Sequence, residues 1–403
     1  MRRAVLACSF LVVLAGGGVA RAQTPEPRLE DYFMQGQIER SESYRGPRYA
    51  MSFGALGLSL VVLGAMGWGP GSRRLARWSE RATRARWWVQ GALLTGVVTA
   101  VPVVATLPLA LLRHNHDRDF GLATNSSVGY LADLAKGLGF SLVLSAVGAL
   151  LFVFAARRWM RAWPVIVAVG AAGVTFLLSF VFPVLYEPAF NRFEPAPEPL
   201  RARVHALAHD AGVEVRDVLI TDASRRTTAH NAYVSGFGAT KRVVLFDNLV
   251  RELPPPQVDL VVAHELAHDA YQDVLRGTAL GAVGVVIGIV VLSMLLRRRR
   301  VLERIGARAP GDPAVVPFIA LFIAVAGLVS QPAVNGISRS VEARADRAAI
   351  ELTDDADTAV ALEVSLALEN IADLTPNAFV RWAFFTHPTT LERIGIALEA
   401  ARS

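Results

Sequence analysis

Apolar residues gather in six long runs that short polar or charged segments separate. Each run approaches the ~20 residues that a membrane-spanning helix needs. A further apolar run, residues 4–20, follows Arg2 and Arg3 and precedes Ala-Arg-Ala, the pattern of a secretory signal peptide over residues 1–22. An uncleaved first membrane helix is the alternative for that segment. The six runs predict a polytopic membrane protein, and they lie at about 51–69, 89–112, 138–156, 163–185, 277–296 and 313–334.

The remaining sequence predicts one folded domain in two halves. Residues 188–276 show a helical pattern at about 200–211, strand-like runs at 218–221 and 242–246, and a helix after Pro256. Gly236 and Gly238 mark a turn between the two strand-like runs. Residues 335–403 indicate two or three helices. We therefore expect a mainly α protein: an outer segment 23–50, a four-helix membrane region 51–187, and a transmembrane hairpin 277–334 between two halves that share a small β-sheet.

Composition agrees with a membrane protein. Hydrophobic types make up 53% of the 403 residues and charged types 19%, below the ~25% usual in soluble chains. The net charge of +6 comes almost entirely from arginine, because Lys136 and Lys241 are the only lysines. A nucleic-acid partner would require a basic face on a folded domain, whereas these arginines stand between apolar runs. We expect the lipid bilayer as a partner and no nucleic acid.

The arginines predict an orientation. Three segments hold fifteen of them: six in loop 70–88, three in loop 157–162 and six after residue 296. With six spans these segments share one side, which the positive-inside rule makes cytoplasmic. We therefore expect a multi-pass protein of the plasma or inner membrane, with residues 23–50, 186–276 and the C-terminal tail on the exterior, periplasmic side.

Residues 264–268 read His-Glu-Leu-Ala-His, an HExxH motif. On a helix, His264 and His268 lie one turn apart on the same face, so both imidazoles can reach one metal ion. Glu265 lies beside them, where a general base for water would be needed. Two surface histidines on an amphipathic helix are the alternative. Cys8 is the only cysteine, so neither a disulfide framework nor a cysteine metal site is available.

Catalytic zinc usually takes three protein ligands, so one more is required. Glu342 is the best candidate, and Asp346, one turn later, could accept a bond from a ligand histidine. HExxH lies just before the span at 277–296 and Glu342 lies just after the span at 313–334. An in-and-out hairpin places both on one membrane face. Helical rise predicts matching heights, ~13 Å from His268 to the first span and ~12 Å from the second span to Glu342.

The chain resembles the integral-membrane CAAX prenyl endopeptidases of type 1 and, more distantly, HtpX-like proteases. The resemblance covers about residues 110–395. Besides HExxH, it is carried by seven stretches: 187–193, 222–226, 230–233, 243–249, 338–346, 387–388 and 392–393. Ala267 stands where the family often has glycine. The family also begins with a membrane span where this chain has its signal-like segment, and its eukaryotic members hold the protease halves on the cytosolic side.

The resemblance implies a gluzincin-type site with one Zn²⁺ per chain. His264, His268 and Glu342 would bind zinc, with Glu265 as general base and Asp346 in support. Asn231 and Ala232 would belong to an edge strand that pairs with an extended substrate backbone. His387 would help to stabilise the oxyanion, with Arg393 nearby. From the residues alone, a turn at Asn231 and a helix-start role for His387 remain the simpler interpretations.

These features predict a membrane-embedded zinc metalloendopeptidase acting on membrane-associated or CAAX-like protein substrates. An HtpX-like protease for the quality control of membrane proteins is the alternative within enzymes. A catalytically inactive scaffold or a transporter is the alternative from another class. Transporters tend to carry ionisable residues inside their spans, and the six apolar runs contain almost none.

Overall fold

The computed structural model describes residues 27–236 and 241–402. Six of its helices are long and apolar enough to cross a membrane, as the apolar runs predict. The signal peptide expected at residues 1–22, with Cys8, lies outside the described residues. The six helices are α1 (Gln35–Gly67), α3 (Trp87–Asp119), α4 (Ser127–Arg158), α5 (Trp163–Tyr186), α9 (Asp273–Leu296) and α11 (Val316–Thr353).

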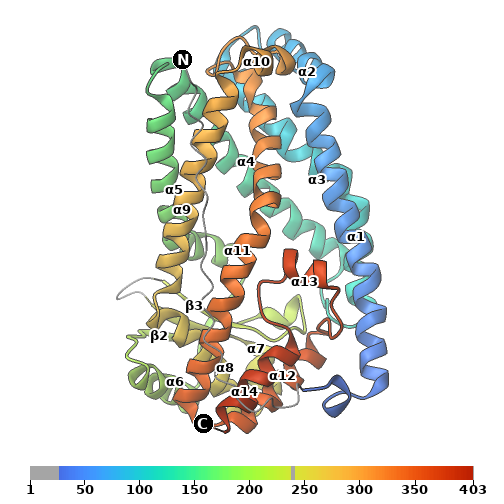
Figure 1. The fold of residues 1–403 in the computed structure, drawn as a ribbon, viewed down its shortest axis with the longest axis vertical. Helices are drawn as coiled ribbons and strands as arrows, with labels where there is room; N and C mark the ends of the chain where they lie inside the picture. Colours follow the sequence, from blue (N-terminus) through green and yellow to red (C-terminus); the bar gives the residue numbers. More distant parts are fainter. Residues whose placement is uncertain (1–26, 237–240, 403) are drawn as a thin grey trace, which may run out of the picture.

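Several of these helices are longer than the apolar runs inside them. α1 has 33 residues and α11 has 38, or ~50 and ~57 Å of helix, against a hydrocarbon thickness of ~30 Å. The excess lies toward the end of the molecule that holds the sheet (Figure 1). In the extension of α1, Arg45 Nε donates to Ile371 O at 2.6 Å and Tyr49 donates to Asp373 at 2.7 Å. The segment expected outside the membrane is therefore a helical arm fastened to the second half.

The two spans of the expected hairpin do not pack mainly on each other. α9 lies against α5, whereas α11 lies against α1 and, beyond the apolar run, against α8 (Pro255–Ala270). The part of α11 after the span thus reaches the HExxH helix directly.

The arginine-rich loops gather at the opposite end from the sheet. α2 (Gly69–Ala82) and α10 (Arg299–Ile305) pack together there (Figure 1). Arg157 Nη1 donates to Gly311 O at 3.5 Å, which brings the third arginine loop to the same end.

A four-stranded sheet lies in the first half. Its strands are β1 (Phe193–Pro195), β2 (Asp217–Thr221), β3 (Ala232–Ser235) and β4 (Arg242–Phe246), in the order β1-β2-β4-β3. The two predicted strands are confirmed as β2 and β4, which pair in parallel. Gly236, at φ 95°, directly follows β3, which pairs antiparallel with β4, whereas Gly238 of the predicted turn lies outside the described residues. Both missed strands are too short to show an alternating pattern.

Helices cover the sheet and join the halves. The predicted helix at 200–211 is α6 (Glu198–Asp210), and α7 (Asp247–Glu252) follows β4. The second half adds α12 (Ala356–Glu369), α13 (Ala378–Phe384) and α14 (Thr390–Ala400) to the end of α11. α8 begins with prolines, which suit a first helical turn. Its apolar face, including Val258 and Leu266, is buried in one core with residues of the sheet, α6, α11, α12 and α14.

The predicted ~13 Å of continuous helix from His268 to the span at 277–296 is wrong. α8 ends at Ala270, and Gln272 adopts a left-handed conformation (φ 56°, ψ 38°) before α9 begins at Asp273. A helical rise therefore cannot be counted through this segment.

Candidate metal centre

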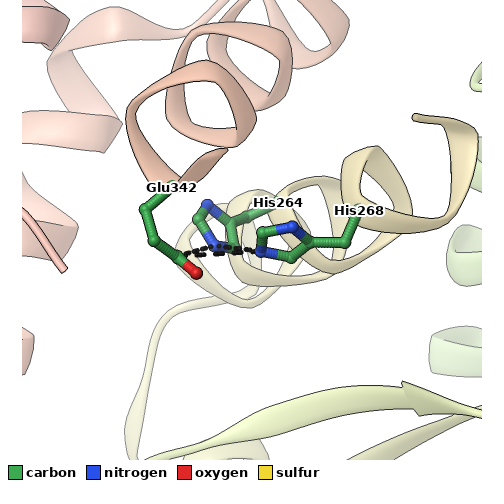
Figure 2. Close-up of side chains that lie close together, drawn as sticks. All are labelled: His264, His268 and Glu342. Carbon is green, nitrogen blue, oxygen red and sulfur yellow. Dashed lines mark hydrogen bonds and ion pairs between the residues drawn. The ribbon is translucent and has the colours of Figure 1, made fainter. Parts of the chain in front are cut away.

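α8 presents both motif histidines on one face, as predicted. His264 Nε2 and His268 Nε2 lie 3.1 Å apart. Glu342 reaches them from α11, with its Oε2 at 3.2 Å from His264 Nε2 and 3.7 Å from His268 Nε2. Figure 2 shows the three side chains converging from the two helices. Their ligand atoms all lie within 4.8 Å of one another.

This donor set fits zinc. Zinc–ligand bonds of 2.0–2.2 Å in a tetrahedron leave neighbouring donor atoms ~3.3 Å apart. The three separations between His264, His268 and Glu342 run from 3.1 to 3.7 Å. Two imidazoles and one carboxylate also form a usual set for catalytic zinc, which keeps a fourth position open.

A carboxylate stands behind each histidine. His264 Nδ1 lies 2.9 Å from Asp346 Oδ1, as the sequence predicts for Asp346. His268 Nδ1 lies 3.1 Å from Asp273 Oδ2, a residue that the sequence analysis missed. Arg344 in turn forms an ion pair with Asp273. Such carboxylates fix the ring so that Nε2 faces the metal. Asp273 is the first residue of α9, and only the break at Gln272 turns it toward His268.

Arg393 belongs to the support of this centre. Its guanidinium donates two bonds to Asp346, at 2.9 and 2.6 Å, and its Nη1 lies 3.0 Å from Glu363. Asp346 and Glu363 are each only 7% exposed and the side chain of Arg393 is 18% exposed, so the three groups are largely shielded from solvent. Glu363 was also missed, although a signal exists: it interrupts the buried apolar stripe of α12 at Ala359, Leu362 and Ala367.

Burial and the carboxylates shape the proton affinities here. Burial lowers the pKa of His264, but Asp346 and Glu342 outweigh it and raise that pKa to about 9. The pKa of His268 is raised in the same way, mainly by Glu342 against burial. Burial raises the pKa of Glu265 despite both histidines, which makes its carboxylate a stronger base. Burial also raises the pKa of Glu363 to about 7.

His387 is brought to the same cluster from the second half. Its Nε2 lies 3.2 Å from Glu342 Oε2, and Thr386 Oγ1 lies 2.8 Å from its Nδ1. Partial desolvation lowers the pKa of His387, which favours the uncharged ring. Because the carboxylate of Glu342 can only accept, its contact favours the tautomer with the proton on Nε2, and the hydroxyl of Thr386 can then donate to Nδ1. Thr386 is a third residue that the sequence analysis missed.

Asn231 and Ala232 lie at the start of β3, the edge strand that packs against α8. Asn231 O accepts from Phe246 N at 3.1 Å, so the backbone of Asn231 faces β4. Successive residues of a strand face opposite neighbours. The N–H and C=O groups of Ala232 and Val234 therefore point to the open edge.

At the N-terminal end of β3, other segments of the chain occupy the edge of the sheet. The N–H of His230 donates to Asn370 Oδ1 at 3.0 Å, and that of Thr228 donates to Leu122 O at 3.1 Å. Arg226 O accepts from Thr124 N at 3.1 Å. The segment after α3 thus occupies the backbone immediately before β3, and no strand among the described residues pairs with the edge-facing groups of Ala232 and Val234.

A cavity of about 500 Å³ adjoins this closed end. Thr227, Ala229 and Asn370 line it together with Arg45, Arg48, Arg226, Asp117, Asp133 and His114. Its three arginines face two carboxylates, which leaves a positive balance. His114 is 4% exposed, and its Nε2 has no hydrogen-bond partner among the described residues.

Comparisons with known proteins agree with this architecture. Residues 196–401 match peptidase family M48, and residues 18–192 match the CAAX prenyl protease N-terminal region of five membrane helices. The chain is 27% identical to an uncharacterized metalloprotease, YhfN, of Bacillus subtilis, over 80% of this chain and 76% of that protein. It is 23% identical to CAAX prenyl protease 1 of Saccharomyces cerevisiae, over 76% and 71% of the two chains.

Among solved structures, the crystal structure of S. mikatae Ste24p has the same fold. It superposes with a TM-score of 0.83 at 19% identity, over 92% of this chain and 91% of that one. The helical membrane bundle, the split domain with its small sheet and the two family matches lead to one conclusion. The chain belongs to the CAAX prenyl protease family of M48 peptidases and is a membrane-embedded metalloprotease.

Proposed function

We propose that this protein is a zinc-dependent endopeptidase that cleaves membrane-associated, CAAX-like protein substrates near a chain end. The observation that carries the proposal is the convergence of His264, His268 and Glu342 at distances that suit tetrahedral zinc. His387 contacts Glu342, and Glu265 is close enough to interact electrostatically with all three. A catalytically inactive scaffold would gain nothing from this arrangement, because burying several charged groups together costs free energy of folding.

His264, His268 and Glu342 would hold the metal, and Asp346 and Asp273 would keep the two imidazoles turned toward it. Zinc bound there would act as a Lewis acid that polarises the scissile carbonyl and lowers the pKa of water. The protein residues do the rest of the chemistry.

Glu265 would take a proton from the attacking water and deliver it to the leaving amine. Its burial supports this role, because a carboxylate of raised pKa accepts a proton more readily. His387 would donate a hydrogen bond from Nε2 to the developing oxyanion, and Thr386 would keep the proton on that nitrogen.

The substrate would lie extended along β3 and bond to the backbone of Ala232 and Val234. A chain running toward Thr228 meets Asn370 and the segment 122–124, so it must end or turn into the adjoining cavity. The positive balance of that cavity favours a carboxyl terminus. This geometry supports processing near a carboxyl end over the quality-control degradation of long unfolded chains.

The direct test is Glu265→Gln in the purified full-length protein. We expect peptide cleavage to fall at least about a hundredfold, with one zinc per chain retained by elemental analysis. Glu351→Gln is the matched control, because Glu351 is an exposed carboxylate on α11. Undiminished cleavage by Glu265→Gln would remove Glu265 from the mechanism, and a wild-type protein without zinc would refute the metal assignment.

The substrate is tested separately with three peptides of one sequence: a free acid, a C-terminal amide and a prenylated free acid. We expect the amide to be cleaved roughly tenfold less efficiently than the free acid, because a buried charge-assisted contact would be lost. Equal cleavage of acid and amide, together with degradation of an unfolded membrane protein, would favour the quality-control alternative.

We further propose that the site faces the exterior, with the arginine-rich end in the cytoplasm. The gathering of α2, α10 and the loop at Arg157 at the end opposite to the sheet supports this orientation. A reporter fused after Ser403 should be active only outside the cytoplasm. Activity confined to the cytoplasm would reverse the orientation and leave the chemistry unchanged.

A further inference from the structure

α2 lies at the end of the molecule opposite to the sheet (Figure 1), and its exposed arginines form a basic surface there. Arg74, Arg77, Trp78 and Arg81, with Ala82, line a shallow depression. All are exposed. Their spacing of three, four and seven residues places them on one helix face.

The arginines of this surface are not neutralised by the protein. Glu80 is the only acidic residue of α2, and it pairs with Arg308 at 2.6 Å. In the part of the chain that the structure describes, no carboxylate lies within ion-pair distance of Arg74, Arg77 or Arg81. Three positive charges thus converge without a counterion.

The opposite face of α2 is fixed to the protein. Ser72 Oγ donates to Ile305 O at 2.9 Å, and Gln90 Nε2 donates to Ser79 Oγ at 3.1 Å. Gly306 (φ 78°) allows the end of α10 to approach α2 closely, because a Cβ at this position would lie only 3.1 Å from Arg73 Cα. The basic face is therefore held outward by a packed and hydrogen-bonded back.

The position of α2 is that of a headgroup-level element. It connects the end of α1 at Gly67 to the start of α3 at Trp87. Trp68, Trp78 and Trp88 are 40, 49 and 55% exposed around it. Tryptophan concentrates at the membrane–water boundary, where its ring sits at the depth of the lipid headgroups.

We propose that the Arg74–Arg77–Trp78–Arg81 face of α2 binds the headgroup of an anionic phospholipid. The guanidinium groups donate forked hydrogen bonds to the phosphodiester oxygens. The indole of Trp78 lies against the glycerol and upper acyl region. A zwitterionic lipid is disfavoured, because its ammonium group would face three uncompensated positive charges.

The test is lipid retention by the full-length protein, measured by native mass spectrometry after extraction from vesicles of phosphatidylcholine with and without phosphatidylglycerol. Wild type should keep phosphatidylglycerol selectively. The combined Arg74→Gln, Arg77→Gln and Arg81→Gln variant should lose roughly tenfold or more of it. The combined Arg297→Gln, Arg298→Gln and Arg300→Gln variant should not, although it removes the same charge from the same end.

Equal losses in both variants would show diffuse charge attraction and overturn the site, as would undiminished retention in the α2 variant. Displacement of the lipid by inorganic phosphate would also overturn it, because a free anion would then be the ligand. Arg77→Lys keeps the positive charge but replaces the bidentate guanidinium by a single ammonium group, and we expect it to weaken lipid retention severalfold. Zinc content should be unchanged throughout, since the metal centre lies at the other end.

Discussion

The two ends of the membrane bundle use charge in opposite ways. At the sheet end, Asp346 and Glu363 are buried, and both pair with the largely buried Arg393 behind the proposed metal ligands. At the arginine end, Arg74, Arg77 and Arg81 are exposed, and none of them forms an ion pair with another described residue. A buried charge must have a partner at a fixed distance, whereas an exposed charge needs only to be on the correct side of the membrane. Substitutions should therefore matter far more at the first end.

The largest contrast is expected between Arg393→Leu and Arg300→Leu. Arg393→Leu leaves two buried carboxylates without their cation, which should cost about 3–5 kcal/mol of stability and reduce zinc affinity roughly 10- to 100-fold. Arg300 is exposed at the other end, so its loss should stay within about 0.5 kcal/mol. Thermal unfolding in detergent and zinc titration measure both effects, and equal effects would contradict the contrast.

His387→Ala should act on catalysis and not on folding. We expect kcat to fall about 10²- to 10³-fold at nearly unchanged KM, because the hydrogen bond is made to charge that develops in the transition state. Thr386→Val should give a smaller loss of kcat, since it removes the hydrogen bond between the Thr386 hydroxyl and Nδ1 of His387. Exposed His209 on α6 provides the control, His209→Ala. A rise in KM with kcat unchanged would instead make His387 a substrate-binding residue.

Proline substitutions along β3 should separate substrate pairing from sheet pairing. Val234→Pro removes an N–H from the open edge, where proline is tolerated, and should lower kcat/KM roughly two- to tenfold. Tyr233→Pro removes a bond to β4 and should lower the melting temperature. If Val234→Pro leaves cleavage intact, the substrate does not pair with this strand.

The last prediction concerns the pH dependence of stability. The pKa of Glu363 is about 7 in the folded protein and near 4.5 in the unfolded chain, so folding takes up a proton between these values. The Glu363 contribution to stability is therefore most favourable below pH 4.5 and declines as pH rises toward 7. Between pH 5.5 and 7.5, Glu363→Gln should remove about 1–2 kcal/mol of the pH-dependent change in unfolding free energy. The measurement compares the melting temperatures of the variant and of wild type at these two pH values. An unchanged slope would place the carboxyl in its ionised form.

The apolar spans, the HExxH motif and the helix that carries Glu342 were predictable because each is a local pattern. His264 and His268 need only one turn of helix to meet, and an apolar run identifies itself by length. Glu342 required the additional argument that an even number of spans returns the chain to the same side. The structure brings all three together.

Asp273, Glu363 and Thr386 could not be found in the same way. Asp273 reaches His268 only because α8 ends and the chain turns at Gln272. Glu363 meets Arg393 through the packing of α12 on α14. Thr386 acquires a role only once His387 is placed beside Glu342.

The amino-acid sequence by itself determined which segments are long and apolar enough to cross a membrane, which residues are candidates to bind a metal and where the arginines lie along the chain. These follow from hydrophobicity, side-chain chemistry and helical spacing, which act over a few residues. Only the tertiary structure decided which carboxylate lies behind which histidine, where the edge of β3 is open and which arginines lack an ion pair among the described residues. Those depend on distances between residues far apart in the chain, and packing alone sets them.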